Sequence, residues 1–175
     1  YYDDLLLRRA GLVKHRKYLE LLSKQIKSVQ TTPGRKVHPV GMSSYDAWIK
    51  YYRRDENTWN TTVSYYSKGA LIAFLLDAKI RKATDGKKTL DDLMRLAYKR
   101  FSGEKGFSTS SFRATANEVY GGALDDFFEA TVDGVEELDY SEALSYYGLE
   151  FEEEKKSEEE DESENPIAGW VGAKI

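Results

Sequence analysis

The chain has 175 residues, a formal net charge of −4 and no cysteine. This length suits one domain that buries roughly 70% of its unfolded surface. The lack of cysteine excludes disulfides and thiolate metal sites and fits a reducing compartment. No apolar run reaches the ~20 residues that span a bilayer, so we expect no membrane partner.

The charge is unevenly distributed along the chain. Residues 152–164 contain nine acidic residues and two lysines, a local charge of −7, and the other residues sum to about +3. A remainder so close to neutral argues against a nucleic-acid partner. The acidic run has no apolar side chain to bury, which predicts a flexible linker over residues 152–165. Residues 169–175 are typical of the start of a further strand.

Two helices are predicted at the start of the chain. Gly11 is a typical C-terminal residue for a helix over residues 1–10. A second helix is predicted over residues 14–30, because apolar side chains recur there at helical spacing. The residues of this apolar stripe are Tyr18, Leu21, Leu22, Ile26 and Val29.

The next segment is predicted to be a loop followed by a capped helix. Residues 35–42 have no clear period and are expected to be extended or irregular. Ser43 or Ser44 can cap a helix over residues 45–53. Asp46 lies three residues after Ser43, as in a capping box that uses Asp in place of Glu.

The most apolar stretch of the chain predicts a central buried helix. Residues 70–76 contain no polar side chain, and a helix that is apolar on every face belongs inside a domain. We expect this helix to run from about residue 64 to 82. Tyr65, Tyr66 and Lys68 form its entry, and a buried phenol needs either a hydrogen-bond partner or an opening toward a cleft.

Further helices are predicted downstream, which makes the fold class mainly α. Gly86 suits a turn, and Thr89 caps the next helix. The buried face of that helix is predicted to consist of Leu90, Leu93, Met94, Ala97, Tyr98 and Phe101. Shorter helices are expected over residues 110–120, 124–131 and 139–147, and a short strand over 149–151.

The sequence offers little for metal binding or nucleophilic catalysis. The two histidines, His15 and His38, lie on separate segments, and neither belongs to a His-Glu-x-x-His motif. We therefore expect both on the surface and predict no metal site within this chain. Glycine-rich phosphate loops and a Gly-x-Ser-x-Gly motif are also absent.

Paired acidic residues occur at three predicted helix starts. The pairs at 91–92 and 125–126 are first-turn acids, which the helix dipole favours, and we interpret them as structural. The pair at 3–4 follows two tyrosines and remains open to a functional role.

Tyr66 is the best single candidate for chemistry. A phenol at the N-terminal end of a buried helix can donate a hydrogen bond to the oxyanion that develops on a reacting carbonyl. From spacing alone, a core tyrosine bonded to a backbone carbonyl is the favoured alternative.

Several segments together resemble the glycyl aminopeptidase family of PDZ-linked, thermolysin-like (gluzincin) zinc peptidases. The resemblance covers roughly residues 1–150 and is specific in combination rather than in any single motif. Its segments are residues 1–11 (YYDDLLLRRAG), 46–50 (DAWIK), 55–57 (DEN) and 64–69 (SYYSKG).

The resemblance implies that residues 1–151 form the helical C-terminal part of a peptidase catalytic domain. It places the three zinc ligands upstream of Tyr1, so zinc is expected in the longer parent and not in this piece. Helix-like sequence at the start and strand-like sequence at residues 169–175 agree with a piece of a longer protein. Residues 166–175 would then lead into a PDZ domain.

The resemblance also implies roles for single residues. Tyr66, in the stretch Tyr-Ser-Lys-Gly, would stabilise the tetrahedral intermediate, with Tyr65 taking the role if the register differs by one. The attacking nucleophile would be a zinc-bound water. Lys68 and Gly69 are interpreted as structural, the lysine in a salt bridge or extended to solvent and the glycine at a close helix contact.

The implied activity is release of N-terminal glycine or alanine from a peptide substrate. Glu56, Asn57 and Asn60 are candidates for binding the amino end of that substrate. The expected partners are the peptide, the upstream zinc-binding half and the downstream PDZ domain. Two alternatives stay open, a non-catalytic helical module that binds a peptide and a purely structural helical spacer.

Overall fold

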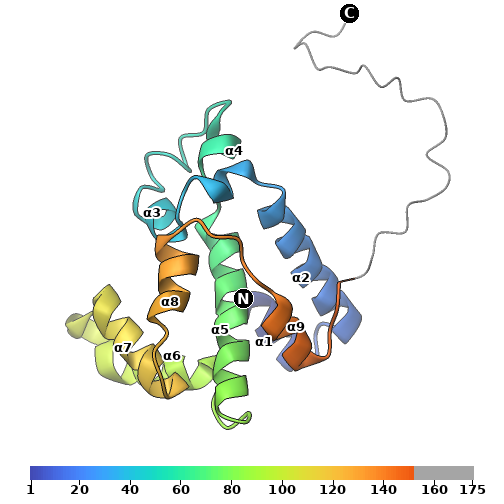
Figure 1. Cartoon of the computed structure of the whole chain (residues 1–175), viewed down its shortest axis with the longest axis vertical. Helices are drawn as coiled ribbons and strands as arrows, with labels where there is room; N and C mark the ends of the chain where they lie inside the picture. The colour runs from blue at the N-terminus through green and yellow to red at the C-terminus, as the bar shows by residue number, and fades with distance from the viewer. Residues whose placement is uncertain (152–175) are drawn as a thin grey trace, which may run out of the picture.

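The computed structural model describes residues 1–151 as a mainly helical domain, with no strand among them (Figure 1). The acidic linker and the lead-in predicted for residues 152–175 lie outside this range. None of the helices in the described part is long and apolar enough to cross a membrane. The elements are α1 (Tyr2–Arg9), α2 (His15–Gln30), η1 (Pro33–Lys36), α3 (Val40–Tyr45), α4 (Thr58–Thr61), α5 (Tyr65–Ala83), α6 (Leu90–Phe101), η2 (Gly103–Lys105), α7 (Thr109–Tyr120), α8 (Asp125–Phe128), η3 (Glu129–Asp133) and α9 (Ser141–Tyr147).

Helix α5 is the centre of the fold, as the apolar run at residues 70–76 predicts. Its 19 residues span about 28 Å. Ser64 caps it, and the Ser64 hydroxyl accepts a hydrogen bond from the Ser67 amide at 3.2 Å. Figure 1 shows α5 upright between two groups of helices.

Each side of α5 packs against its own apolar cluster. One cluster joins α5 to α2, α3 and α9, and the other joins it to α6, α7 and α8. The helix therefore has no solvent face along its middle, which explains its lack of amphipathic periodicity. The first cluster contains Leu22, Ile26, Val29, Val40, Leu71, Ile72, Phe74, Leu75, Ala78, Leu138, Tyr140 and Ala143. The second contains Leu76, Ile80, Leu90, Leu93, Ala116, Val119, Leu124 and Phe128.

A single buried carboxylate connects three other helices to α5. Asp77 of α5 accepts hydrogen bonds from the hydroxyl of Tyr1 at 2.7 Å, the Nε of Arg81 at 2.9 Å and the amide of Leu90 at 2.7 Å. The Tyr147 hydroxyl donates a fourth at 3.3 Å. Burial first, and then the negative charge of Asp77, raise the pKa values of both tyrosines, so their hydroxyls stay protonated donors.

Helix α1 has no buried residue of its own and is held by polar contacts. The Tyr2 hydroxyl and Arg9 reach Asp91 in the first turn of α6, at 2.8 and 2.7 Å. Burial raises the pKa of Asp91, but these two donors outweigh it and hold the pKa below its usual value. The structural role predicted for this acid thus extends to attaching α1.

The predicted helix over residues 45–53 is wrong. The helix here is α3, which begins after Pro39 and ends at Tyr45, so Ser43 lies inside it and donates to the Val40 carbonyl at 3.0 Å. Asp46 caps nothing, because its carboxylate lies 2.7 Å from the Lys50 Nζ and 3.3 Å from His38 Nε2. These tertiary partners override the local capping pattern.

Two smaller predictions also differ from the structure. Residues 149–151 form no strand, because no neighbouring strand exists among the described residues. Met94 and Tyr98 of α6 are 45% and 75% exposed, so the buried face of this helix is narrower than the spacing predicts. Leu90 and Leu93 on that face are buried as predicted.

Neither Lys68 nor Gly69 makes the contact predicted for it. Lys68 is only 1% exposed, and its Nζ forms no hydrogen bond with any described residue, so it neither extends to solvent nor pairs with an acid. Burial lowers its pKa. Gly69 has open space where a side chain would point. The close backbone contact is instead at Gly34, where a Cβ would overlap the Thr62 carbonyl oxygen.

Alanine at Gly34 and alanine at Gly69 should change the free energy of unfolding in opposite directions. Gly34→Ala should lower the free energy of unfolding by about 1–3 kcal/mol, because the methyl group must displace backbone. Gly69→Ala should raise it by about 0.5–1 kcal/mol, because a mid-helix alanine is favoured over glycine. Urea unfolding monitored by circular dichroism measures both, and equal effects would contradict the contacts described.

Removing the charge of Asp77 should destabilise the domain strongly. Asp77→Asn leaves the Arg81 guanidinium unpaired and loses charge-assisted hydrogen bonds, so we expect a loss of about 3 kcal/mol in unfolding free energy. Asp125→Asn is the control, since Asp125 is an exposed acid in the first turn of α8. A loss no larger than that of the control would show that the four-helix junction does not depend on this carboxylate.

Candidate functional site

The first turn of α5 extends beyond the core and carries a cluster of tyrosines. The rings of Tyr65 and Tyr66 lie 4.4 Å apart, and the Tyr51 ring meets Tyr65 edge-on at 6.2 Å. The hydroxyls of Tyr52 and Tyr65 are 3.0 Å apart and form a hydrogen bond. Trp48 packs on Tyr52 with ring centres 5.0 Å apart. The result is an aromatic surface where the buried helix begins.

Tyr66 is open to solvent, as are Trp48 and Tyr52 of the same cluster. Its side chain is 66% exposed, so it is not a tyrosine sealed in the core. The neighbouring hydroxyl of Tyr65, and then that of Tyr52, lower the pKa of Tyr66, whereas the hydrogen bond with Tyr52 is the main cause that raises the pKa of Tyr65. A phenol with a lowered pKa is a stronger hydrogen-bond donor, which suits it to stabilise a negative oxygen.

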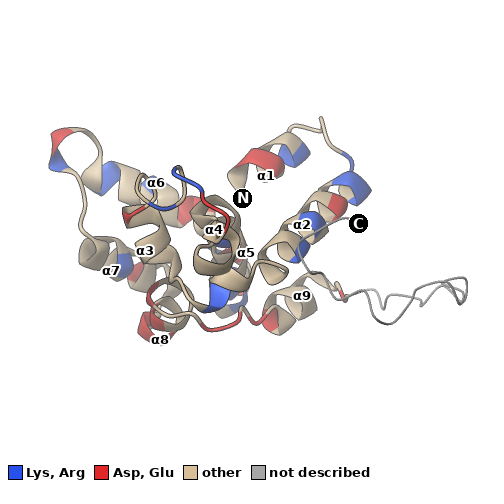
Figure 2. Cartoon of the chain, turned by 90° about the horizontal axis from the view of Figure 1, so that it is seen from above, with Lys and Arg blue, Asp and Glu red and all other residues tan. Residues whose placement is uncertain are grey.

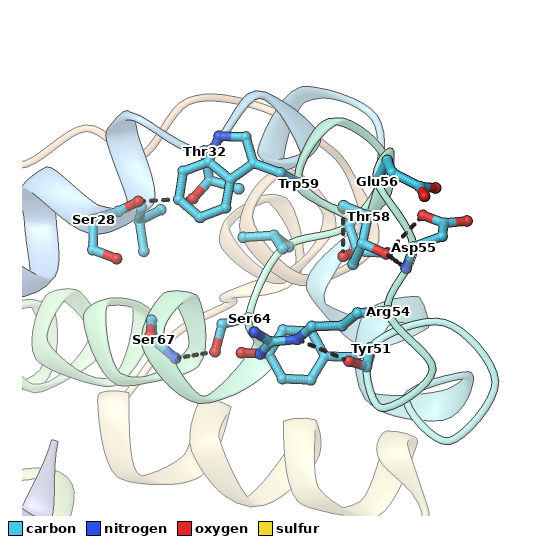
Figure 3. A pocket seen from close by; sticks show the side chains of 13 residues that line it. Ser28, Thr32, Tyr51, Arg54, Asp55, Glu56, Thr58, Trp59, Ser64 and Ser67 are labelled. Carbon is cyan, nitrogen blue, oxygen red and sulfur yellow. Dashed lines mark hydrogen bonds between the residues drawn. The ribbon is translucent and has the colours of Figure 1, made fainter. Parts of the chain in front are cut away.

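A cavity of about 260 Å³ lies beside this cluster (Figure 3). Tyr51 is shared between the cluster and the cavity, and the Arg54 guanidinium lies 4.8 Å from the centre of its ring. Trp59 of α4 forms part of the opposite wall in Figure 3, and Ser64 and Ser67 mark the start of α5. Aromatic faces combined with a few hydroxyls and charges are typical of a site for a small polar ligand.

The three residues predicted to bind the substrate lie close in sequence but differ in position. Glu56 lines the cavity and points outward in Figure 3. Asn57 and Asn60 bond to each other, with the Asn60 amide donating to the Asn57 Oδ1 at 3.0 Å, and neither lines the cavity. Asp55 is occupied by the Asn57 amide and the Thr58 hydroxyl, at 3.0 and 2.9 Å. Of the two carboxylates that line the cavity, Glu56 is therefore the one without a hydrogen bond to another described residue.

The histidines and acids do not form a metal site in the described part of the chain. No group of three or more His, Cys, Asp or Glu side chains comes together there. His15 is exposed as predicted, and its ring contacts the Arg8 guanidinium. His38 is 6% exposed, so its predicted surface position is wrong, and only Asp46 stands beside its ring. These residues do not fit a zinc ion.

The paired acids lie away from the tyrosine cluster. The pair at residues 3–4 is in the first turn of α1, and the pair at residues 125–126 is in the first turn of α8. Asp92 completes the capping box of Thr89 and accepts the Thr89 amide at 2.8 Å. The structural interpretation of the pair at residues 91–92 agrees with these contacts.

Sequence reasoning missed the aromatic partners of Tyr65. Tyr51 and Tyr52 come from the segment after α3, and the loop through α4 brings them back to the start of α5. The only local signal was composition, since a second Tyr-Tyr pair stands 14 residues before Tyr65-Tyr66. Their meeting depends on the path of the loop, which periodicity does not predict.

Comparison with known proteins finds a family similarity over the part of the chain that contains this site. Residues 1–72 match the model of the M61 glycyl aminopeptidase family. The matched range runs from α1 into the apolar part of α5, and it includes the tyrosine cluster and every residue that lines the cavity. No curated protein matches the chain. The first 72 residues of this chain are therefore similar to the M61 glycyl aminopeptidase family.

Proposed function

We propose that this chain is part of a peptidase that releases N-terminal glycine or alanine from peptides. In this proposal the start of α5 forms one wall of the substrate cleft, and Tyr66 donates its hydroxyl to the oxyanion of the scissile carbonyl. The observation that carries the proposal is an exposed phenol at the first turn of a buried helix, within the range that matches the family. An oxyanion donor must be both accessible and held in place, and packing against Tyr65 limits the motion of Tyr66.

The neighbouring cavity supports recognition of a free amino end. Its carboxylates are Asp55 and Glu56, and Asp55 is already hydrogen-bonded within the loop. Glu56 has no such bond among the described residues and can accept from an ammonium group. Trp59 adds an aromatic face that attracts a cation. A substrate with a blocked amino end would lose both interactions.

Metal chemistry is proposed for the longer parent only. Because the described residues do not fit a zinc ion, the ligands that the family resemblance implies would lie upstream of Tyr1. The partners in this proposal are that upstream half, a downstream PDZ domain and the peptide substrate. If the upstream half lacks its zinc ligands, the aromatic cavity would serve a peptide-binding module instead, which is the second candidate function.

The role of Tyr66 can be tested by Tyr66→Phe in the full-length protein. Loss of one oxyanion donor typically costs about 10²–10³ in kcat, so kcat/KM on a glycyl substrate should fall by that factor. Tyr98→Phe is the control, because Tyr98 is 75% exposed on α6. An unchanged kcat/KM for Tyr66→Phe rules out the assignment, and a loss confined to Tyr65→Phe moves the role by one residue.

Substitution of Glu56 tests the proposed recognition of the amino end. Glu56→Gln keeps the shape and removes the charge, so we expect KM for a glycyl substrate to rise about tenfold with a nearly unchanged kcat. Glu104→Gln, at an exposed acid in η2, is the matched control. A drop in kcat without a change in KM would contradict a binding role for Glu56.

A further inference from the structure

A second cavity, of about 400 Å³, lies where α1, α2, α5 and α9 meet. Apolar side chains from three of these helices form much of its wall, namely Leu5, Leu19, Leu22 and Phe74. The size lies within the range of small-molecule sites. This cavity is lined by Asp77 of α5 and not by Tyr66. Asp77 follows Tyr66 by eleven residues, which is about 16 Å along the helix axis. The two sites are therefore at different levels of the central helix.

The charge around this cavity is mainly positive. Arg9 and Arg81 line it but are neutralised by carboxylates, through the pairs with Asp91 at 2.7 Å and Asp77 at 2.9 Å. Arg8 differs, because no carboxylate of the described residues pairs with it. Figure 2 shows the basic end of α1 leading into the basic start of α2.

Arg8 contacts another potentially cationic group instead of an acid. Its Nη2 lies 2.5 Å from Nδ1 and 3.1 Å from Nε2 of His15. A guanidinium can only donate, so the imidazole has to accept, and no negative charge in this contact balances Arg8. His15 is also the first residue of α2, where the helix dipole adds positive potential. An anion between these groups would supply the missing charge.

The Tyr18 hydroxyl supplies a neutral donor at the same cavity. It forms no hydrogen bond with any residue of the described range, although the side chain is half-buried and lines the cavity. Burial first, and then the nearby carboxylate of Asp4, raise the pKa of Tyr18, so the hydroxyl stays protonated and available. Asp77, the acid in the lining, is already bound by four donors.

We propose that this cavity binds a monocarboxylate with an apolar body. The planar guanidinium of Arg8 matches a carboxylate in a bidentate pair, and the Tyr18 hydroxyl donates to the same group. The apolar body lies against Leu19, Leu22 and Phe74, which a bare inorganic anion would leave uncovered. Arg8 has no carboxylate partner among the described residues and lies beside an apolar wall. The cavity should therefore bind the amphipathic acid more tightly than phosphate.

The test uses 4-phenylbutyrate as the probe and the full-length protein. Its binding is measured by isothermal titration calorimetry alongside the neutral isostere 4-phenylbutyramide and inorganic phosphate. We expect millimolar or tighter binding of the acid, and binding at least tenfold weaker for both comparison compounds. Charge-assisted hydrogen bonds to one arginine are worth about 1.5–3 kcal/mol, which is a factor of roughly ten or more.

Two substitutions link the binding to the cavity. Arg8→Gln should weaken 4-phenylbutyrate at least tenfold, and Arg16→Gln is the matched control because the Arg16 side chain, in the first turn of α2, is 94% exposed. Tyr18→Phe should weaken the acid by a smaller factor and leave the folded circular dichroism spectrum unchanged. The proposal would be overturned if the acid and the amide bound with equal affinity. It would also be overturned if the Arg8→Gln and Arg16→Gln variants bound the acid equally well, or if the acid showed no binding at 10 mM.

Discussion

The buried carboxylate of Asp77 is the contact on which the arrangement of the helices depends. A charge removed from water is costly unless donors surround it, and here the donors come from both ends of the described chain. Tyr1 and Tyr147 are brought to the same atom group on α5, while the Leu90 amide fixes the start of α6. The junction therefore sets where α1 and α9 lie, and with them the second cavity.

The role proposed for Tyr66 depends on the point along α5 at which other helices no longer cover it. Along its middle the helix is covered on both sides, so its axis cannot tilt without disturbing two clusters. Its first turn passes beyond those clusters, which leaves Tyr66 open while its backbone belongs to a rigid element. A site on such a helix is held more precisely than a site on a loop. The loop of Glu56 then closes the other side of the cavity.

Features with local signals were predictable, and features that need distant partners were not. The apolar run of residues 70–76 predicted α5, and the cap at Thr89 predicted α6. Both signals consist of residues that are close together in the sequence. The spacing of Asp46 predicted a helix cap, but in the fold its carboxylate lies beside the ring of His38, eight residues earlier. Likewise Tyr66 was a candidate from its position on the helix, whereas the hydrogen bond between its neighbour Tyr65 and Tyr52 depends on a loop path that no spacing specifies.

The enclosed amine of Lys68 makes unfolding a proton-consuming reaction. Burial lowers the pKa of this lysine below its usual 10.5, and the unfolded chain restores it. Between the lowered value and 10.5 the unfolded state binds more protons, so through this residue stability increases as the solution becomes more alkaline. The heat of unfolding in that window then includes the ionisation heat of the buffer, and amine and phosphate buffers give different apparent enthalpies.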